Sequence, residues 1–466
     1  MKAGFYECDI TPPIGAERPA DIRKRLVEKI SDPLKIRVCI LSDEKIKVAL
    51  VGIDNCGVGD EFKNQVEAAL PEYNLIISAS HTHYGGNLWD KIPEIENAPK
   101  EIRKFALEDK TAYDEVYYTF CLKQFITAVK MADRDLTEVD FSFGNRRVEN
   151  LIFNRRIRMK AGNVQTHPGK GNPDNLAYAG PVDDELGAVG IWKKGSDQLL
   201  GCILNFSCHA CINLEGATAD FPGVAIDTVR KVYGQDIGVV YLNGASGDVT
   251  QIDNLSLRRD SGKDIAVKLG RVIGAKAIEI LATADRGACS TLRCLTKQLP
   301  LKRNVHNILS EEELAECWSI VRDKNADRTS VYRAKGQIVD DFILQNTQKE
   351  PVENLKVLQI GPLVIGSSSG EPFAQYALDF KKASGFPFTW YSQLAGIELG
   401  YVPTPDCFDE SGGGYETSIA KFAPETGREM ICTLNELVSR LTPEAVPKPD
   451  EVKPVVKSWA YNFNKK

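Results

Sequence analysis

The sequence predicts an α/β (mixed α+β) fold, with a large β-sheet core flanked by helices. Two observations lead to this prediction. Strand and helix patterns interleave along the whole 466-residue chain, which is typical of α/β and mixed α+β proteins. In addition, polar residues that can carry chemistry directly follow several of the apolar strands. Sheets of this class bind ligands at the carboxyl ends of their strands, so we expect the functional site there.

The elements are predicted from the spacing of apolar residues. Short apolar runs or apolar alternation predict strands. The predicted strands are residues 35–41, 46–53, 74–79, 139–143, 199–206, 237–242, 357–360 and 363–366. Apolar positions at helical spacing predict helices. The predicted helices are residues 61–70, 112–131, 222–233, 266–281, 311–322, 372–382 and 426–441.

The domain organisation follows from length and composition. A chain of 466 residues is long enough for about three average domains, but large enzymes often use this length for one core with insertions. No repeat of fixed period occurs, so we expect one domain over residues 1–441. Residues 442–466 are rich in proline and charge, and we expect them to form an extended tail. The sequence carries no signal of oligomeric state.

Composition excludes several classes of partner. The net charge of −6 is not that of a basic protein with a positively charged surface for phosphates, so we do not expect nucleic acid as a partner. No apolar run approaches the roughly 20 residues that span a bilayer, so we expect no integral membrane segment. The N-terminus lacks the charged and apolar regions of a secretory signal, and we therefore expect a cytoplasmic protein. The 12 cysteines form no regular framework, which indicates reduced thiols.

Two of the 5 histidines lie in the segment HTHYGG, which follows the predicted strand 74–79. On extended backbone, the side chains of residues i and i+2 point to the same side, so His81 and His83 can act together. The two glycines allow a turn and a close approach by a substrate. Taken alone, the motif fits either a metal site or a hydrogen-bonded pair of core histidines.

Three further polar residues occupy the same kind of position. His209 follows the predicted strand 199–206, Asp248 lies in a glycine turn after the next strand, and Glu371 follows the strand 363–366. Each has a structural alternative: a core histidine, a solvated turn aspartate, or a glutamate that stabilises a helix N-terminus. Two histidines with one glutamate are a familiar catalytic zinc set, which leaves a position open for water. We therefore predict a zinc site at the carboxyl ends of strands.

A series of short motifs runs along the chain to about residue 415. The motifs are Asp9-Ile10-Thr11-Pro12-Pro13, Asp32-Pro33-Leu34, Asp54, His81-Thr82-His83-Tyr84-Gly85-Gly86, Phe153-Asn154-Arg155, His209, Gly247-Asp248-Val249, Gly370-Glu371, Tyr401-Val402-Pro403-Thr404-Pro405 and Tyr415-Glu416. Their identity and order resemble the catalytic domain of the neutral (alkaline, non-lysosomal) ceramidase family. In that family, zinc is held by the first histidine of HTH, a second histidine, a glutamate and a tyrosine. The resemblance therefore implies that His81, His209, Glu371 and Tyr401 are metal ligands.

The resemblance also implies roles for residues around the metal. His83 and Arg155 correspond to residues near the scissile carbonyl, and Tyr415 corresponds to a further active-site tyrosine. The serine of the family's GDVS motif is replaced by Thr250 here. A threonine hydroxyl is hindered as a nucleophile by its extra methyl group, so we expect it to orient the substrate or a water molecule. His83 or Asp248 could carry the proton.

The chain departs from the family in two other places. True ceramidases carry a C-terminal immunoglobulin-like domain, and we expect none here. The loop after HTH is apolar in lipid-cleaving members, whereas residues 89–110 are rich in charge. Desolvating a charge costs several kcal/mol, so such a loop is a poor entrance for two acyl chains. We therefore expect a small and more polar substrate than ceramide.

The leading prediction is a zinc-dependent hydrolase that cleaves an amide (N-acyl) bond with a metal-activated water. Arg155 and Tyr415 would stabilise the developing negative charge. A metal-dependent esterase or lyase acting on a sugar derivative is an alternative, because a Lewis-acid metal serves either reaction. A non-catalytic binding protein on the same fold is a second alternative. The presence of all four proposed ligands and of the arginine argues against a binding protein.

Overall fold

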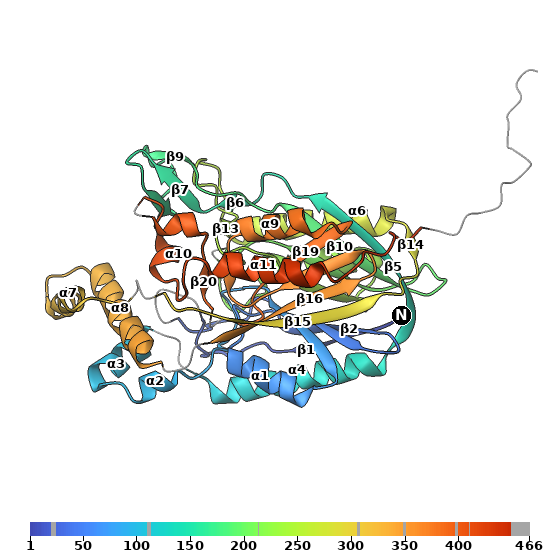
Figure 1. The fold of residues 1–466 in the computed structure, drawn as a ribbon, viewed down its shortest axis with the longest axis horizontal. Coiled ribbons are helices and arrows are strands. Elements are labelled where there is room, and N and C mark those ends of the chain that lie inside the picture. The colour runs from blue at the N-terminus through green and yellow to red at the C-terminus, as the bar shows by residue number, and fades with distance from the viewer. Residues whose placement is uncertain are drawn as a thin grey trace, which may run out of the picture.

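The computed structural model describes residues 1–19, 25–109, 113–212, 214–304, 308–347, 351–396, 399–409 and 411–448. A large sheet forms the centre of this part of the chain (Figure 1). Its strands are β1 (Lys2–Asp9), β2 (Lys35–Ser42), β3 (Lys47–Ile53), β4 (Tyr73–Ala79), β5 (Thr137–Arg147), β10 (Glu185–Lys193), β11 (Leu199–Phe206), β12 (Gly238–Asn243) and β14 (Arg286–Gly287). The strand order is β12-β11-β10-β5-β1-β2-β3-β4, and β14 pairs with β5 beside this path.

The large sheet curls so that β12 contacts β2, β3 and β4. A second sheet packs against it, with the order β15-β16-β17-β19. Its strands are β15 (Leu292–Pro300), β16 (Val352–Ile360), β17 (Leu363–Ser367) and β19 (Phe388–Ser392). Between the sheets lies a core of fully buried aliphatic and aromatic side chains, among them Leu50, Ile203, Leu358 and Trp390. Burial of this apolar surface is the main force that holds the two sheets together.

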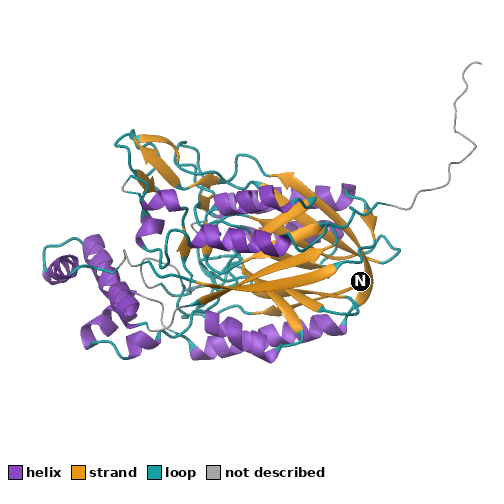
Figure 2. Ribbon diagram, in the orientation of Figure 1, coloured by secondary structure: helices purple, strands orange, loops and turns teal. Residues whose placement is uncertain are grey.

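Helices cover the outer faces of both sheets (Figure 2). The helices α1 (Asp60–Ala69) and α4 (Glu115–Arg134) pack on β1–β4. The helices α5 (Asp220–Tyr233) and α6 (Lys263–Thr283) pack on β10–β12. The helices α9 (Ala374–Ser384) and α11 (Thr426–Val438) cover the second sheet. The architecture confirms the predicted fold class of a large sheet core flanked by helices.

A group of helices projects from one end of the molecule, at the left of Figure 1. We call this group the helical cap. Its members are α2 (Pro93–Glu96), α3 (Lys100–Asp109), α7 (Glu311–Arg322) and α8 (Arg328–Asn346). The cap has a small core of its own, which includes Phe105, Cys317 and Ile338. Most of the charged segment 89–110 therefore folds as the helices α2 and α3.

Short elements near the cap complete the described chain. They are β6 (Phe153–Asn154), β7 (Arg156–Met159), β8 (Val164–Thr166), β9 (Asn175–Tyr178), β13 (Val249–Thr250), β18 (Glu371–Pro372), β20 (Tyr401–Val402), the 3-10 helix η2 (Pro405–Phe408) and α10 (Tyr415–Ser418). Several of them pair across long stretches of sequence, as β6 does with β13 and β18 with β20. These pairings bring the predicted site residues to one end of the sheets.

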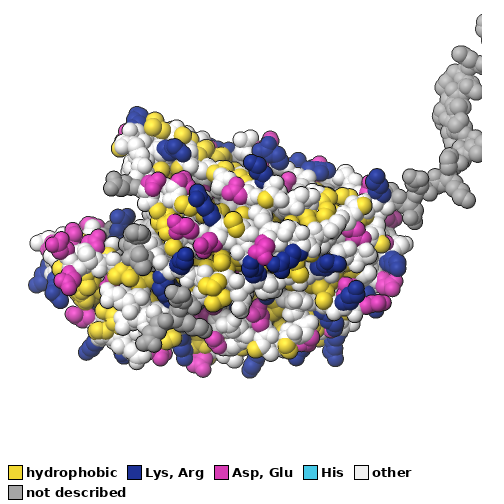
Figure 3. Space-filling view, viewed as in Figure 1, with side chains coloured by type: hydrophobic (Ala, Val, Ile, Leu, Met, Phe, Trp, Pro, Cys, Tyr) yellow, Lys and Arg dark blue, Asp and Glu magenta, His cyan; other side chains and the backbone are white. Residues whose placement is uncertain are grey.

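The surface carries charges of both signs across the face in view (Figure 3). All 12 cysteines are free thiols, most of them buried. No helix in the described ranges is long and apolar enough to cross a bilayer. Residues 442–448 of the predicted tail run without helix or strand beside the second sheet, where the Gln359 amide donates to the Thr442 carbonyl oxygen. The rest of the tail, from residue 449, lies outside the described residues. So do residue 110 of the charged segment and residue 112 of the predicted helix 112–131.

Candidate metal centre

The first predicted ligand, His81, lies just beyond the carboxyl end of β4. Its backbone has a φ of 64°, a left-handed conformation that is uncommon for residues other than glycine and that often marks a functional site. The ring nitrogen Nδ1 lies 2.6 Å from the Cys56 carbonyl oxygen. Because a carbonyl oxygen only accepts, Nδ1 carries the proton and Nε2 presents its lone pair. The backbone turn therefore aims a metal-binding nitrogen into the site.

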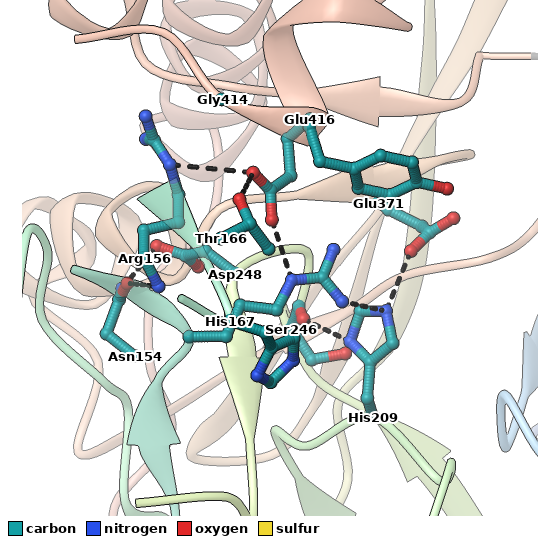
Figure 4. A network of polar contacts seen from close by, with 12 residues as sticks. Asn154, Arg156, Thr166, His167, His209, Ser246, Asp248, Glu371, Gly414 and Glu416 are labelled. Carbon is teal, nitrogen blue, oxygen red and sulfur yellow. Dashed lines mark hydrogen bonds and ion pairs between the residues drawn. The ribbon is translucent and has the colours of Figure 1, made fainter. Parts of the chain in front are cut away.

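The second predicted ligand, His209, is held in the same way beyond the end of β11. Its Nδ1 lies 2.6 Å from the Ser246 carbonyl oxygen, as Figure 4 shows. Ser246 belongs to the glycine turn that follows β12, and β11 and β12 are parallel neighbours. The sheet therefore places His209 beside its own orienting carbonyl. Such a hydrogen bond to the far nitrogen is the usual support of a metal-binding imidazole.

Glu371 and Tyr401 reach the site through the pairing of β18 with β20, in which they are direct partners. Gly247 makes the position of Glu371 possible, because a β-carbon there would overlap the Glu371 carbonyl oxygen. The Tyr401 ring lies nearly parallel to the His209 ring, with an interplanar angle of 8° and 6.5 Å between centroids. All four predicted ligands therefore meet at one end of the sheets.

Three side chains form what we call the ligand cluster: His81, His209 and Glu371. The Nε2 atoms of His81 and His209 lie 3.2 Å and 3.1 Å from the same carboxylate oxygen, Glu371 Oε2. The three ligand atoms lie within 4.8 Å of one another, and all three residues are buried. Within the described chain, His81 Nε2 and Glu371 Oε2 have no hydrogen-bond partner outside the ligand cluster. A buried divalent cation would satisfy these lone pairs, and the nitrogen and oxygen donors fit zinc.

The electrostatics of the ligand cluster favour positive charge at its centre. Burial alone would raise the pKa of Glu371, but His81 and His209 hold it well below its usual value. Burial alone would lower the pKa of His81, but Cys56 and Glu371 raise it well above its usual value. Burial, Arg155 and His81 lower the pKa of His209 to about 3. Glu371 is therefore ionised and His209 is neutral, which are the states that bind a metal, whereas the raised pKa of His81 means that its Nε2 gives up a proton and exposes the lone pair when a metal binds.

A second group adjoins the first, and we call it the arginine cluster: Arg155, Arg156 and Glu416, which are buried, and Thr166, which is half-buried. Arg155 Nε donates to Glu416 Oε1 at 2.7 Å, and Arg155 Nη1 lies 3.1 Å from His209 Nε2. The Thr166 hydroxyl donates to Glu416 Oε2 at 2.6 Å, as seen in Figure 4. Arg155 Nη2 is buried without a hydrogen-bond partner among the described residues. One donor of the guanidinium is thus left for a bound molecule.

His83 and Tyr415 stand at the edge of the ligand cluster. The His83 ring lies 4.9 Å from the His81 ring, centroid to centroid. Burial and the nearby His81 and His209 hold the pKa of His83 well below its usual value, so this imidazole is neutral. Tyr415 is 51% exposed, and its ring centroid lies 5.7 Å from that of Tyr401. Both side chains are placed where they can meet a substrate.

The structure places Asp248 and Thr250 in local networks. Asp248 accepts from the Asn154 amide at 2.6 Å and from the backbone N–H of Ala374 at 2.9 Å. Both carboxylate oxygens are therefore engaged in tying β6 to the start of α9. The Thr250 hydroxyl donates to Gln251 Oε1 at 3.2 Å and accepts from the backbone N–H of Ile252 at 3.3 Å. Neither side chain belongs to the ligand cluster.

Several residues with contacts in the site were given no role by the sequence, among them Arg156 of the arginine cluster. Glu416 and Thr166 belong to the arginine cluster, and the Cys56 sulfur lies 3.6 Å from His81 Nδ1. His167 follows Thr166 with a φ of 50°, and although the residue is exposed, desolvation of its ring and the nearby Arg155 lower its pKa to about 4. A positive φ cannot be read from sequence at a histidine, but the adjacency of Glu416 to the predicted Tyr415 was an available signal.

Comparison with known proteins supports the fold at low sequence identity. No family model and no curated protein matches the chain. The structure is similar to that of a neutral ceramidase from Pseudomonas aeruginosa, with a TM-score of 0.70 and 16% identity, covering 96% of this chain and 76% of that chain. It is also similar to a structure described as a ceramidase complexed with C2, with a TM-score of 0.69 and 15% identity, covering 96% and 77% of the two chains. The chain therefore has a ceramidase-like fold, as its motifs predicted.

Proposed function

We propose that this protein, which has a ceramidase-like fold, is a zinc-dependent hydrolase that cleaves the amide bond of a small N-acyl compound. The proposed ligands are His81, His209, Glu371 and Tyr401. The observation that carries the proposal is the ligand cluster, in which two imidazole lone pairs face one buried carboxylate oxygen. Buried polar groups are almost always satisfied, so this arrangement implies a cation. The fold gives further support, because the two similar structures are those of proteins named as ceramidases.

Zinc bound there would lower the pKa of a water molecule to about 7 and polarise the substrate carbonyl. The protein's own contribution begins with orientation. The carbonyl oxygens of Cys56 and Ser246 fix the two imidazoles, so that no ring rotation is needed when a substrate arrives. Arg155 Nη2, which is buried and without a partner among the described residues, would donate to the carbonyl oxygen as negative charge develops on it. A preorganised donor of this kind is among the largest contributions to catalysis.

Proton transfer is assigned to His83, and a hydrogen bond to the substrate is assigned to Tyr415. His83 is neutral because burial and its neighbours lower its pKa, so it can accept a proton from water and return it to the leaving amine. The surrounding protein raises the pKa of Tyr415 to about 12. The phenol therefore keeps its proton at neutral pH and can donate a hydrogen bond to the substrate. Asp248 is the weaker candidate for proton transfer, because both of its oxygens already accept hydrogen bonds.

The substrate is proposed to be more polar than ceramide. The helical cap projects beside α10, which begins with Tyr415 (Figure 1), and Tyr332 of α8 is near enough to raise the pKa of Tyr415. The exposed charged side chains of α3 belong to the same helical cap, because α3 packs against α8. Bringing a long acyl chain past such groups would require their desolvation, at several kcal/mol for each charge.

A substrate screen on zinc-loaded protein tests the proposal. The panel contains short-chain N-acyl amines, detergent-solubilised long-chain ceramide, and acylated sugars. We expect turnover of short N-acyl amines, with ceramide a poor substrate. Preference for acylated sugars would favour the esterase or lyase alternative, and faster turnover of ceramide than of every soluble compound would overturn the polar substrate. Binding without turnover across the panel would favour a non-catalytic protein.

A further inference from the structure

Glu416 is a fully buried carboxylate with no place in the proposed chemistry. Glu416 is 0% exposed, and it lies in α10, directly after Tyr415. Its two oxygens take different partners: Oε1 accepts from Arg155 Nε at 2.7 Å, and Oε2 accepts from the Thr166 hydroxyl at 2.6 Å. Arg156 Nε lies 3.6 Å from Oε2. One carboxylate therefore connects the segments of β6, β7, β8 and α10.

These contacts restrict the Arg155 guanidinium. A guanidinium is planar and presents its donors in a fixed fork. The bond from Nε to Glu416 Oε1 fixes the orientation of that fork, because the three nitrogens are rigidly joined. The contact of Nη1 with His209 Nε2 would be given up when His209 binds a metal, so Glu416 is the partner that remains. Nη2 is the buried donor without a hydrogen-bond partner among the described residues, and it lies in a guanidinium that also interacts with the Tyr401 side chain.

Glu416 also gives Arg155 an ion-pair partner other than the carboxylate of Glu371. Glu371 is close enough to influence the charge of Arg155, and it is a proposed metal ligand. An arginine without its own carboxylate would be drawn to Glu371, since a buried charge is costly unless it is paired. Glu416 provides that pair on the side away from the ligand cluster. The same side chain holds α10, and with it Tyr415, against β8.

We propose that Glu416 is a positioning residue, which aims Arg155 Nη2 at the reacting carbonyl and holds Tyr415 beside it. The proposal rests on the proposed function, because it gives Arg155 and Tyr415 their roles in the reaction. A purely structural ion pair is the competing explanation. The chain offers a matched example of such a pair in Asp183, a 5% exposed carboxylate that lies 2.8 Å from Lys381 and contacts no residue of either cluster among its described partners.

The test is a double-mutant cycle with Glu416→Gln and Arg155→Met on a short N-acyl amine. Glutamine keeps the size of Glu416 but removes its charge. We expect Glu416→Gln to lower kcat about tenfold or more, because small misplacements of a catalytic group are costly, while KM and bound zinc change little. In the Arg155→Met background, most of this loss of kcat should disappear, and the part that remains measures how far Glu416 acts through Tyr415. Asp183→Asn serves as the control, and we expect it to lower thermal stability but to leave kcat unchanged.

A second readout does not depend on turnover. In protein with isotope-labelled arginine, the Arg155 Nε–H signal is assigned by its loss in Arg155→Met, and we expect it to shift in Glu416→Gln. If Glu416→Gln does not fold, Thr166→Val removes one bond to Glu416 and should give a smaller change of the same kind. Unchanged kcat in Glu416→Gln, equal losses in both backgrounds, or an unmoved Nε–H signal would overturn the proposal. If wild type turns over nothing, the proposed function fails and the Nε–H signal alone decides on positioning.

Discussion

The ligand cluster and the arginine cluster both have a buried glutamate at their centre. They differ in how that glutamate is satisfied. Both oxygens of Glu416 accept hydrogen bonds from neighbouring side chains. In contrast, Glu371 Oε2 faces two imidazole nitrogens and has no hydrogen-bond partner outside the ligand cluster in the described chain. The contacts of Glu416 are those of a buried ion pair, whereas three potential ligand atoms that converge on one point fit a bound cation.

The largest expected effect is on the ligand cluster. His81→Ala, His209→Ala or Glu371→Ala should each abolish stable metal binding, because one of four proposed ligands is lost. Without the metal, the rate on the best substrate should fall beyond about a thousandfold. The matched control is His167→Ala, a histidine of the same region outside the ligand cluster, which should keep its metal. Full metal content in His209→Ala, measured by elemental analysis, would contradict the assignment.

The arginine cluster should respond differently, with metal retained and catalysis impaired. Arg155→Met removes the proposed donor to the developing negative charge. Loss of one such donor typically lowers kcat by about a hundredfold to a thousandfold. Steady-state kinetics and elemental analysis on the same sample check both halves of this prediction. If Arg155→Met lost its metal together with its activity, Arg155 would be needed for metal binding, and the two clusters would not have separate functions.

Asp248 gives a smaller effect that depends on pH. Burial raises its pKa to about 6 in the folded protein, against about 3.9 for an unfolded aspartate. The folded state therefore binds the proton more tightly. Protonated Asp248 therefore contributes about 3 kcal/mol to the free energy of unfolding. This contribution is fully present below about pH 4 and is lost as the pH rises through 6.

Asp248→Asn lacks this titration. At pH 4 the variant should be less stable than wild type, because its amide faces that of Asn154. Between pH 4 and pH 7 the free energy of unfolding of wild type falls by about 3 kcal/mol and that of the variant does not, so the difference between the two proteins should change by this amount in favour of the variant. Urea unfolding at a series of pH values measures the difference. Parallel curves for variant and wild type would show that Asp248 titrates normally.

The smallest predicted effect is at Thr250, which lies in neither cluster. Thr250→Ala removes a hydroxyl that already serves its neighbours Gln251 and Ile252. Loss of one hydrogen bond costs about 1 kcal/mol, so we expect a several-fold loss of rate with full metal content. Trapping of an acyl group on Thr250 by mass spectrometry would show that the hydroxyl is a nucleophile instead.

The sequence predicted elements best where local signals agree. The predicted strand 199–206 coincides with β11, whose residues are nearly all apolar. The predicted helix 311–322 coincides with α7, which Ser310 and Glu313 cap reciprocally. The sequence did not predict β1, β10 or β15, where charged residues or glycines interrupt the apolar pattern. Those strands form because long-range pairing overrides weak local preference.

The same division applies to the site. His81, His209 and Glu371 were predictable because each follows a strong apolar strand, and the family motifs added Tyr401. The pairing of Glu416 with Arg155 and Thr166 was not predictable, since these contacts join residues 250 or more positions apart in the chain. The adjacency of Glu416 to Tyr415 marks its position but not its partners. The sequence therefore indicates which residues can bind a metal, and the structure shows what holds them in place.

The most direct test of the central claim is the metal content of the chelator-free purified protein. Elemental analysis of wild type and of Glu371→Ala, prepared side by side, counts bound zinc per chain. We predict close to one equivalent in wild type and almost none in the variant. Less than about a tenth of an equivalent in wild type after incubation with zinc, or equal content in both proteins, would contradict a metal centre at the ligand cluster.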